Sequence, residues 1–193
     1  MASRPTRREI THERIVDTAA RALRRNGYAG VGVADVMKQA GLTHGGFYAH
    51  FESRDALLAE AVERAGRDTG VVMAKRIDAS RARGESGLRT LVEGYLSEAH
   101  LNGIESGCVV AALSSEMPRQ SPALLAPSVE RVRKLIALVR RALPEGGSKE
   151  QAMVIAGTMV GALQLARALG AGAQGKAMLA AARSALLTQY DNG

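Results

Sequence analysis

The sequence predicts an all-α protein of about nine helices, with an N-terminal three-helix head joined to a larger helical body. Strand signals are nearly absent, because alternation of β-branched residues is rare and no Asn-Gly pair lies between two alternating segments. Long runs rich in Ala, Leu, Arg and Glu favour helix instead. Glycine and proline breaks divide these runs. We expect residues 1–52 to form the head and residues 53–193 the body.

Apolar periodicity and the breaks between runs place the individual helices. Residues 103–107 are expected to form a loop, Pro118 to stop a helix and residues 144–147 to separate two more. Gly66 and Gly70 are weak points inside the long helix that connects head and body. The predicted helices are residues 11–26, 33–40, a short helix after Thr43, 54–82, 86–102, 108–117, 122–143, 148–169 and 174–189.

The most informative segment is residues 33–51, which predicts a helix, a tight turn and a second short helix. Val33, Val36, Met37 and Ala40 have the spacing of one apolar helix face. Gly41 ends this helix, since glycine takes the left-handed conformation without steric cost.

Thr43 is expected to cap the second short helix through its hydroxyl. Phe47 and Phe51 are predicted to point into the core. The opposite side of this helix is expected to carry almost no side chains, because it is formed by Gly45, Gly46 and Ala49. Such a bare helix surface fits deep in a groove.

Over residues 7–62 the chain resembles the TetR family of bacterial transcriptional repressors. Residues 40–43 match the family's turn and residues 47–51 its recognition helix. Two positions depart from the family pattern, because Met37 replaces a small alanine and Gly32 replaces a serine or threonine cap. The other matching residues are Ala19, Ala20, Leu23, Gly27, Tyr28, Ser53, Arg54 and Leu57.

The resemblance implies that the second helix of the motif enters the major groove of DNA. It assigns phosphate contacts to Thr43, Tyr48, His50 and Arg54, with backbone contacts near Thr11 and Val33. His44 and Tyr48 are the long side chains left to read base edges, and Gly45 and Gly46 allow the backbone to approach closely. Specificity is then expected to depend on thymine methyl contacts and DNA shape.

The two histidines of this helix have other possible roles. His50 is either a phosphate donor or a half-buried packing residue. A metal site shared with His44 is excluded, because six residues place them about 240° apart around a helix. The sequence indicates no metal site and no cofactor.

Charge and composition agree with a DNA-binding protein. The formal net charge is +7, and the first 54 of the 193 residues hold nine Lys/Arg against five Asp/Glu. The single cysteine, Cys108, excludes an internal disulfide and fits a reducing compartment. The polar start resembles no signal peptide, and Gln164, Arg167 and several glycines interrupt the weakly polar tract 156–175. We therefore expect a cytoplasmic protein.

A helix-turn-helix regulator usually binds DNA as a two-fold dimer. The resemblance assigns dimerisation to the last two helices. Ile155, Met159 and Leu163 are expected to face the chain's own core. The alternative is that the glycines of this helix accommodate a neighbour within the chain. The predicted interface residues are Gly157, Gly161, Leu165 and Ala168.

The resemblance also implies a small-molecule pocket in the body, whose occupation releases DNA. With an aromatic content of only 3%, an aromatic cage for a cation is disfavoured, and an apolar pocket with a few polar anchors is expected. Cys108 is either an inert packing residue or a thiol sensor at a helix start. The candidate lining residues are Tyr95, His100, Cys108, Leu113, Met117, Met159 and Gln164.

These observations predict a ligand-responsive transcriptional repressor that binds a palindromic double-stranded DNA operator as a homodimer. One alternative is a DNA-binding protein without an effector. Another is a helical enzyme that uses Cys108 as nucleophile and His100 as base, although no third orienting group is evident. The effector, the operator sequence and the choice between repression and activation do not follow from the sequence.

Overall fold

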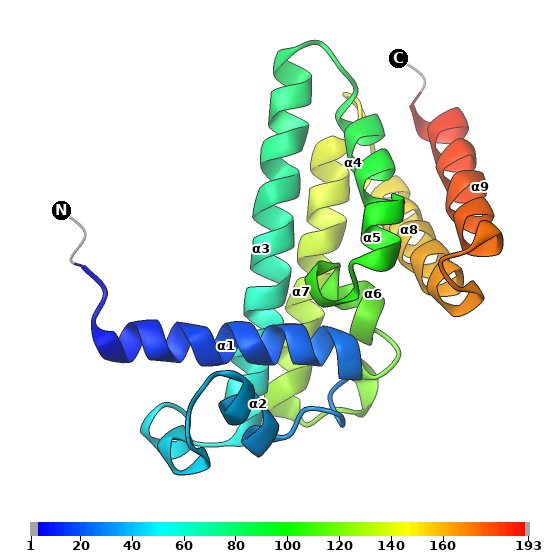
Figure 1. Cartoon of the computed structure of the whole chain (residues 1–193). Helices are drawn as coiled ribbons and strands as arrows, with labels where there is room; N and C mark the ends of the chain where they lie inside the picture. The colour runs from blue at the N-terminus through cyan, green and yellow to red at the C-terminus, as the bar shows by residue number, and fades with distance from the viewer. Residues whose placement is uncertain (1–3, 192–193) are drawn as a thin grey trace.

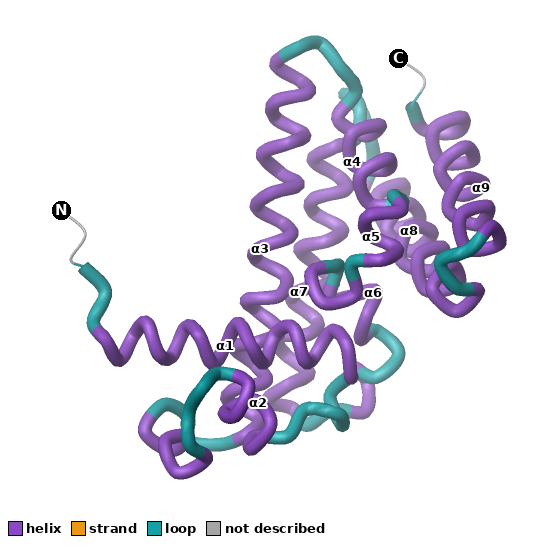
Figure 2. Tube along the Cα trace, in the orientation of Figure 1, coloured by secondary structure: helices purple, strands orange, loops and turns teal. Residues whose placement is uncertain are grey.

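The computed structural model describes residues 4–191 and contains only helices, turns and loops in that range (Figure 2). This confirms the predicted all-α class. The α-helices are α1 (Arg7–Asn26), α2 (Val33–Gln39), α3 (Arg54–Ala82), α4 (Gly87–Tyr95), α5 (Glu98–Asn102), α6 (Val109–Leu113), α7 (Pro122–Ala142), α8 (Lys149–Leu169) and α9 (Ala173–Tyr190). Three short 3₁₀ helices are η1 (His44–Ala49), η2 (Ile104–Ser106) and η3 (Met117–Arg119).

Helix α1 begins four residues earlier than predicted. Thr6 caps it in a capping box, in which the Glu9 amide donates to Thr6 Oγ1 over 3.2 Å and the Glu9 carboxylate accepts from the Thr6 amide over 2.6 Å. Thr11 therefore lies inside the helix, where its hydroxyl donates to the Arg7 carbonyl oxygen. The expectation that Thr11 marks the helix start was wrong, because the capping box precedes the apolar pattern that suggested it.

Helix α3 runs without interruption from the head to the far end of the body (Figure 1). Ser53 caps it by accepting the Ala56 amide. Helix α1 crosses the lower part of α3, and α7 runs beside α3 along the body. Since both α1 and α7 pack on this single helix, α3 connects the head to the body.

The segment predicted as one helix over residues 86–102 is divided into α4 and α5. Leu96 leaves the helical conformation, and Ser97 starts α5 by accepting the His100 amide at Oγ. The Ser97 hydroxyl also donates to the Gly94 carbonyl oxygen. Serine competes for backbone groups in this way, so it ended a helix that the apolar pattern alone would continue.

The next predicted helix, residues 108–117, is also shorter. Only Val109–Leu113 forms α6, with Cys108 at the N-cap position, and Met117 belongs to η3. Pro118 stands at the beginning of η3, where proline is compatible with a helix start.

Helices α8 and α9 pack against each other at the side of the body away from α1 (Figure 1). A capping box between Ser148 and Gln151 starts α8. Ile155, Met159 and Leu163 of α8 are fully buried, as predicted.

Candidate nucleic-acid interface and body cavity

A glycine turn joins α2 to η1 with the predicted geometry. Gly41 has a φ of +70°, its amide donates to the Lys38 carbonyl over 3.0 Å, and the Leu42 amide donates to the Met37 carbonyl over 2.9 Å. These two bonds form a Schellman motif, which requires a left-handed residue after the helix. The turn fixes the angle at which η1 leaves α2.

The segment predicted as the recognition helix is a 3₁₀ helix, η1. Two consecutive glycines are poor helix formers, and three residues per turn replace the 3.6 of an α-helix. His44 and Tyr48 therefore do not share one flank. Tyr48 instead lies on the same side as Gly45, three residues before it.

The exposed side of η1 combines a long side chain with bare backbone. Tyr48 is 72% exposed, the largest exposure among the large hydrophobic side chains described. A Cβ atom added at Gly45 would meet no atom within 4 Å. His44 and Thr43 are exposed as well. This surface can approach a wide groove closely.

The core beneath η1 is formed by Phe47 of η1 and by Phe51, which follows it. Phe47 and Phe51 are 1% and 3% exposed, and their ring centroids are 5.6 Å apart. This confirms their predicted place in the core. Gly46 is half-buried on this inner side, where an added Cβ would lie 3.7 Å from Met37 Cε, so its predicted outward position was wrong.

Thr43 occupies the N-cap position of η1, but its side chain makes no capping hydrogen bond there. Val33 begins α2, as predicted, and Gly32 before it provides no side-chain cap. The sequence had not indicated the role of Arg8, whose Nη2 donates to the Ala49 carbonyl oxygen over 2.9 Å. This contact ties the first turn of α1 to the last residue of η1.

His50 is half-buried beside the core. Its Nδ1 is buried and has no hydrogen-bond partner among the described residues. Burial, together with the neighbouring His12 and Arg8, lowers the pKa of His50, which favours the neutral ring at physiological pH. The ring of His12 stacks on Phe51 with centroids 4.5 Å apart.

Arg54 is used to hold the head together. Its Nε donates to the Val31 carbonyl oxygen over 2.9 Å, and its Nη2 donates to the Tyr28 carbonyl oxygen. The loop between α1 and α2 is thereby fastened to the start of α3. The side chain predicted to contact phosphate is thus hydrogen-bonded within the protein through two of its nitrogens, and the third, Nη1, lies 3.9 Å from Asp55 Oδ1.

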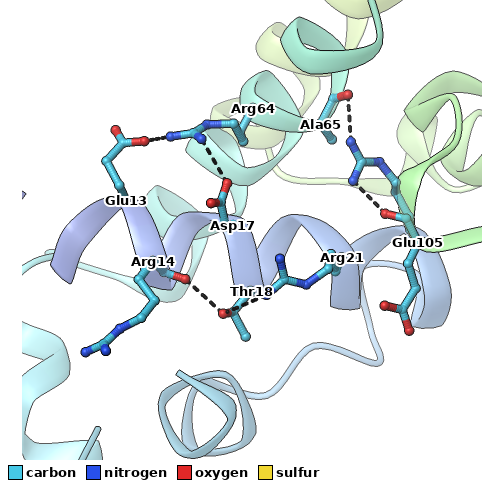
Figure 3. A network of polar contacts seen from close by, with 9 residues as sticks. Glu13, Arg14, Asp17, Thr18, Arg21, Arg64, Ala65 and Glu105 are labelled. Carbon is cyan, nitrogen blue, oxygen red and sulfur yellow. Dashed lines mark hydrogen bonds and ion pairs between the residues drawn. The ribbon is translucent and has the colours of Figure 1, made fainter. Parts of the chain in front are cut away.

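Arginines also fasten α1 to the body (Figure 3). Arg64 of α3 pairs with Glu13 and Asp17 of α1. Arg24 of α1 donates to the carbonyl oxygens of Ala65 and Glu105, over 2.8 and 2.7 Å. These bonds hold α1 across α3.

A tyrosine extends this connection to α7. The Tyr28 hydroxyl lies 2.6 Å from Ser128 Oγ, and Ser128 donates in turn to the Leu124 carbonyl oxygen over 2.6 Å. Glu116 accepts the Tyr28 amide over 3.0 Å. The head and the body therefore share a buried hydrogen-bond chain.

The body contains a cavity of about 720 Å³ between α3, α4 and α7, and residues 106–110 also contribute to its lining. It contains three of the predicted lining residues, Tyr95, His100 and Cys108. The other four predicted residues are not among those that line it. Leu113, Met117 and Met159 are buried in the core, and the Gln164 amide nitrogen donates to Ala111 O and Ser114 Oγ, both over 3.1 Å.

Both ring nitrogens of His100 are engaged. Nε2 accepts the Cys108 amide over 2.9 Å, so the proton lies on Nδ1, which donates to the Tyr95 carbonyl oxygen over 2.6 Å. Burial lowers the pKa of His100 to about 4. The ring therefore positions the backbone before α6 and has no free nitrogen to act as a base for the Cys108 thiol, which is 9% exposed.

One face of α8 is apolar and lacks a partner among the described residues. Gly157 is exposed, and an added Cβ there or at Gly161 would meet no atom within 4 Å. Leu165 is 55% exposed and Ala168 is also exposed. Within residues 4–191, α8 is the helix whose length and composition would suffice to cross a membrane, with 39% of its most apolar window buried.

The described residues hold no group of three or more potential metal ligands.

Comparison with known proteins identifies the head: residues 15–61 match the family model for bacterial regulatory proteins of the tetR family. The HTH-type transcriptional repressor NemR of Escherichia coli is 26% identical over 167 residues, which is 84% of this chain and 81% of NemR.

Solved structures show the same fold over nearly the whole chain. The reduced form of E. coli NemR has a TM-score of 0.76 at 22% identity, covering 93% of this chain and 96% of that one. A TetR transcriptional regulator from Chloroflexus aurantiacus has a TM-score of 0.73 at 26% identity, covering 95% and 96%. FadR of Bacillus subtilis in complex with stearoyl-CoA has a TM-score of 0.67 at 16% identity, covering 91% and 97%.

Proposed function

Because this chain belongs to the TetR family of bacterial transcriptional regulators, we propose that it is a dimeric cytoplasmic repressor that binds a palindromic operator and is released by a small molecule. The observation that carries the proposal is the exposed side of η1, where Tyr48 stands beside the bare backbone of Gly45. Tyr48 and His44 read base edges, and the exposed Thr43 contacts phosphate.

The proposed DNA contacts of the remaining candidates follow from their positions. The amide of Val33 at the start of α2 faces a phosphate, as helix N-termini do. His50 and Arg54 support the interface from within, because one is half-buried and the other is bonded to backbone carbonyls. Exposed cations nearby, such as Arg7 and Lys38, supply the charge that phosphates require.

The apolar face of α8 supports a homodimer. Two copies of the face formed by Gly157, Gly161, Leu165 and Ala168 would let helices approach closely, and α9 would complete a bundle between subunits. The same packing would cover the exposed apolar side chains that make α8 resemble a membrane span by composition.

The cavity supports an effector and argues against a constitutive DNA-binding protein. Its volume lies within the range of small-molecule sites, and it is bounded by α3, the helix that carries the head. The structure of B. subtilis FadR, which has a similar fold, is of a complex with stearoyl-CoA, and this supports a small-molecule effector for the present chain. A cysteine enzyme is disfavoured because both nitrogens of His100 are engaged.

Operator binding tests the DNA interface. Tyr48→Ala is expected to weaken binding to a palindrome selected from the DNA upstream of its own gene by about tenfold or more, since a base contact contributes roughly 1 to 3 kcal/mol. Its circular dichroism should match wild type. Ile104→Ala, which removes an exposed apolar side chain of the body, is the control. Equal affinity of Tyr48→Ala and wild type across a salt series would remove Tyr48 from the interface.

Sedimentation tests the dimer. Gly161→Arg is expected to yield a monomer that has lost specific DNA binding, because a buried charge between helices has neither room nor partner. Ala79→Arg adds the same charge at an exposed position of α3 and should remain dimeric. If Gly161→Arg sediments like wild type, the interface lies elsewhere.

A further inference from the structure

The cavity wall contains an arginine, Arg131, at a position of α7 where the helical periodicity predicts a buried apolar residue. Arg131 lies on the buried stripe of α7, between Ser128 and Leu135, and is only 6% exposed. Arginine is almost never this buried unless it is paired. Arg131 therefore needs a partner.

The partners that the chain itself supplies to Arg131 are weak. Nη1 donates to the Glu63 carbonyl oxygen over 3.5 Å, the limit of a hydrogen bond, and Nε is buried with no hydrogen-bond partner among residues 4–191. No carboxylate of the described chain pairs with it. A buried guanidinium in this state carries much of its desolvation cost uncompensated.

Helix α3 makes room for this side chain. A Cβ atom added at Gly66 would lie 2.3 Å from Arg131 Cδ and 3.1 Å from its Nη1. The glycine thus forms a notch across which the guanidinium passes. Glycine destabilises a helix interior, and Gly66 lies at the point where the Arg131 side chain crosses α3.

A second buried polar group lines the same cavity. Tyr95 is 5% exposed, and its hydroxyl has no hydrogen-bond partner within the described part of the chain. Burial raises the pKa of Tyr95 well above its usual value, with the Cys108 thiol as a further cause, so the hydroxyl keeps its proton. The neighbouring Cys108 thiol is only a weak hydrogen-bond partner, so the hydroxyl is available to donate to a stronger acceptor.

The rest of the lining is apolar at the centre and cationic at the rim. Met73, Leu91, Val109 and Leu135 contribute apolar surface. Arg67, Lys134 and Arg141 are exposed lining residues, and Asp68 is the one acid among those described. Arg141 Nη2 donates to both carboxylate oxygens of Asp78, over 2.6 Å to Oδ1 and 2.7 Å to Oδ2. The charge balance of the lining is positive.

We propose that the cavity binds an apolar organic acid whose anionic group pairs with Arg131 and accepts a hydrogen bond from the Tyr95 hydroxyl. The carbon skeleton lies against the apolar lining. An anion can accept hydrogen bonds from both Arg131 and the Tyr95 hydroxyl. A neutral apolar molecule would leave these donors buried and unpaired, and a cation would be repelled by the positive lining. This ligand class rests on the proposed function only in so far as the bound acid also acts as the effector.

Calorimetric titration with matched acids and amides tests the ligand class. The probes are octanoate, decanoate and 2-naphthoate, each paired with its neutral primary amide of the same skeleton. At least one acid is expected to bind with one molecule per chain and at least tenfold more tightly than its amide. Amides that bind as tightly as the acids, or millimolar acids that all fail to bind, would overturn the proposal.

Substitutions identify the residues that hold the anion. Arg131→Met keeps an unbranched apolar stem and removes the charged guanidinium, and is expected to abolish the preference for acid over amide while leaving the weak binding of the amide. That retained binding shows that the cavity is still formed. Tyr95→Phe should weaken acid binding several-fold. Arg133→Met, at a 72% exposed side chain outside the cavity, is the control and should behave as wild type.

A variant that loses the folded state is replaced by Arg131→Lys, which keeps the charge but loses the fork geometry, and should retain part of the preference. An unchanged preference in every Arg131 variant would overturn the assignment. Release of operator DNA by the acid is measured in a separate experiment. Acid binding that depends on Arg131 but does not release DNA would leave the ligand class standing and remove the effector role.

Discussion

The head and the cavity use their arginines differently. In the head and at its junction with the body, Arg24, Arg54 and Arg64 each reach two acceptors, either backbone carbonyls or carboxylates. In the cavity, Arg131 reaches a single carbonyl at 3.5 Å. Bonded arginines stabilise one arrangement of the head, whereas an arginine without adequate partners is free to bind a ligand. The arginines of the head thus find their partners within the chain, whereas Arg131 leaves donors for the proposed ligand.

The largest effect is expected in the core of the head. Phe47→Ala should lower the free energy of unfolding by about 3 to 5 kcal/mol, because it removes a fully buried ring from beneath η1. Operator binding should be lost with it. Thermal unfolding and circular dichroism measure the effect. Tyr48→Ala, at the adjacent exposed ring, should unfold like wild type, and a comparable loss in both variants would show that the head is not organised around Phe47.

The next effect concerns how firmly His100 holds the backbone at Cys108, which lines the cavity. With a folded-state pKa of about 4, below the usual 6.5, His100 stays neutral while the unfolded chain takes up a proton. Its contribution to stability is complete above about pH 6.5 and declines as the pH falls toward 4, by at most about 3 kcal/mol.

Denaturant unfolding at several pH values measures this contribution. His100→Gln keeps an acceptor for the Cys108 amide without a titrating ring, so its stability should vary less between pH 6.5 and 4 than that of wild type. His44→Gln, at an exposed position, should keep the wild-type slope. Identical slopes for all three proteins would mean that protonation of His100 does not contribute to the pH dependence of stability.

The smallest effect distinguishes two glycines of the same helix. Gly70→Ala should stabilise the protein by roughly 0.5 to 1 kcal/mol, since alanine favours helix and the added Cβ meets no atom within 4 Å. Gly66→Ala should give less than this gain or a loss, because its Cβ displaces Arg131. Thermal unfolding compares the two. An equal gain at both positions would mean that Arg131 moves freely, and the notch would have no role.

The sequence predicted the class, the turn and the core of the head, because these depend on local rules. Gly41 at a left-handed position and Phe47 on the inner side follow from spacing alone. The 3₁₀ geometry of η1 did not follow, since two glycines leave the choice of helix type to the packing around Phe47. The break at Ser97 was missed because the apolar pattern of residues 86–102 continues across it.

The cavity was predicted only in part, since it depends on which helices meet. Tyr95, His100 and Cys108 were identified, whereas Leu113 and Met159 fill the core instead. Arg131 was missed, although a signal was present: a charged residue stands at a core position of an amphipathic helix. Its neighbour Gly66 is far away in sequence, so their contact could not be inferred from either pattern.

The unbroken course of α3 has a thermodynamic consequence. One helix contributes to the cavity wall through Gly66 and supports the head through Ser53, so under the proposed function the same element would couple the two binding events. Coupling between two equilibria is reciprocal: if an acid in the cavity lowers the affinity for the operator by some factor, the operator lowers the affinity for the acid by that same factor. A cell with many operator copies would then need more of the acid to reach half-saturation, and the concentration at which the gene responds would depend on how many sites the regulator occupies.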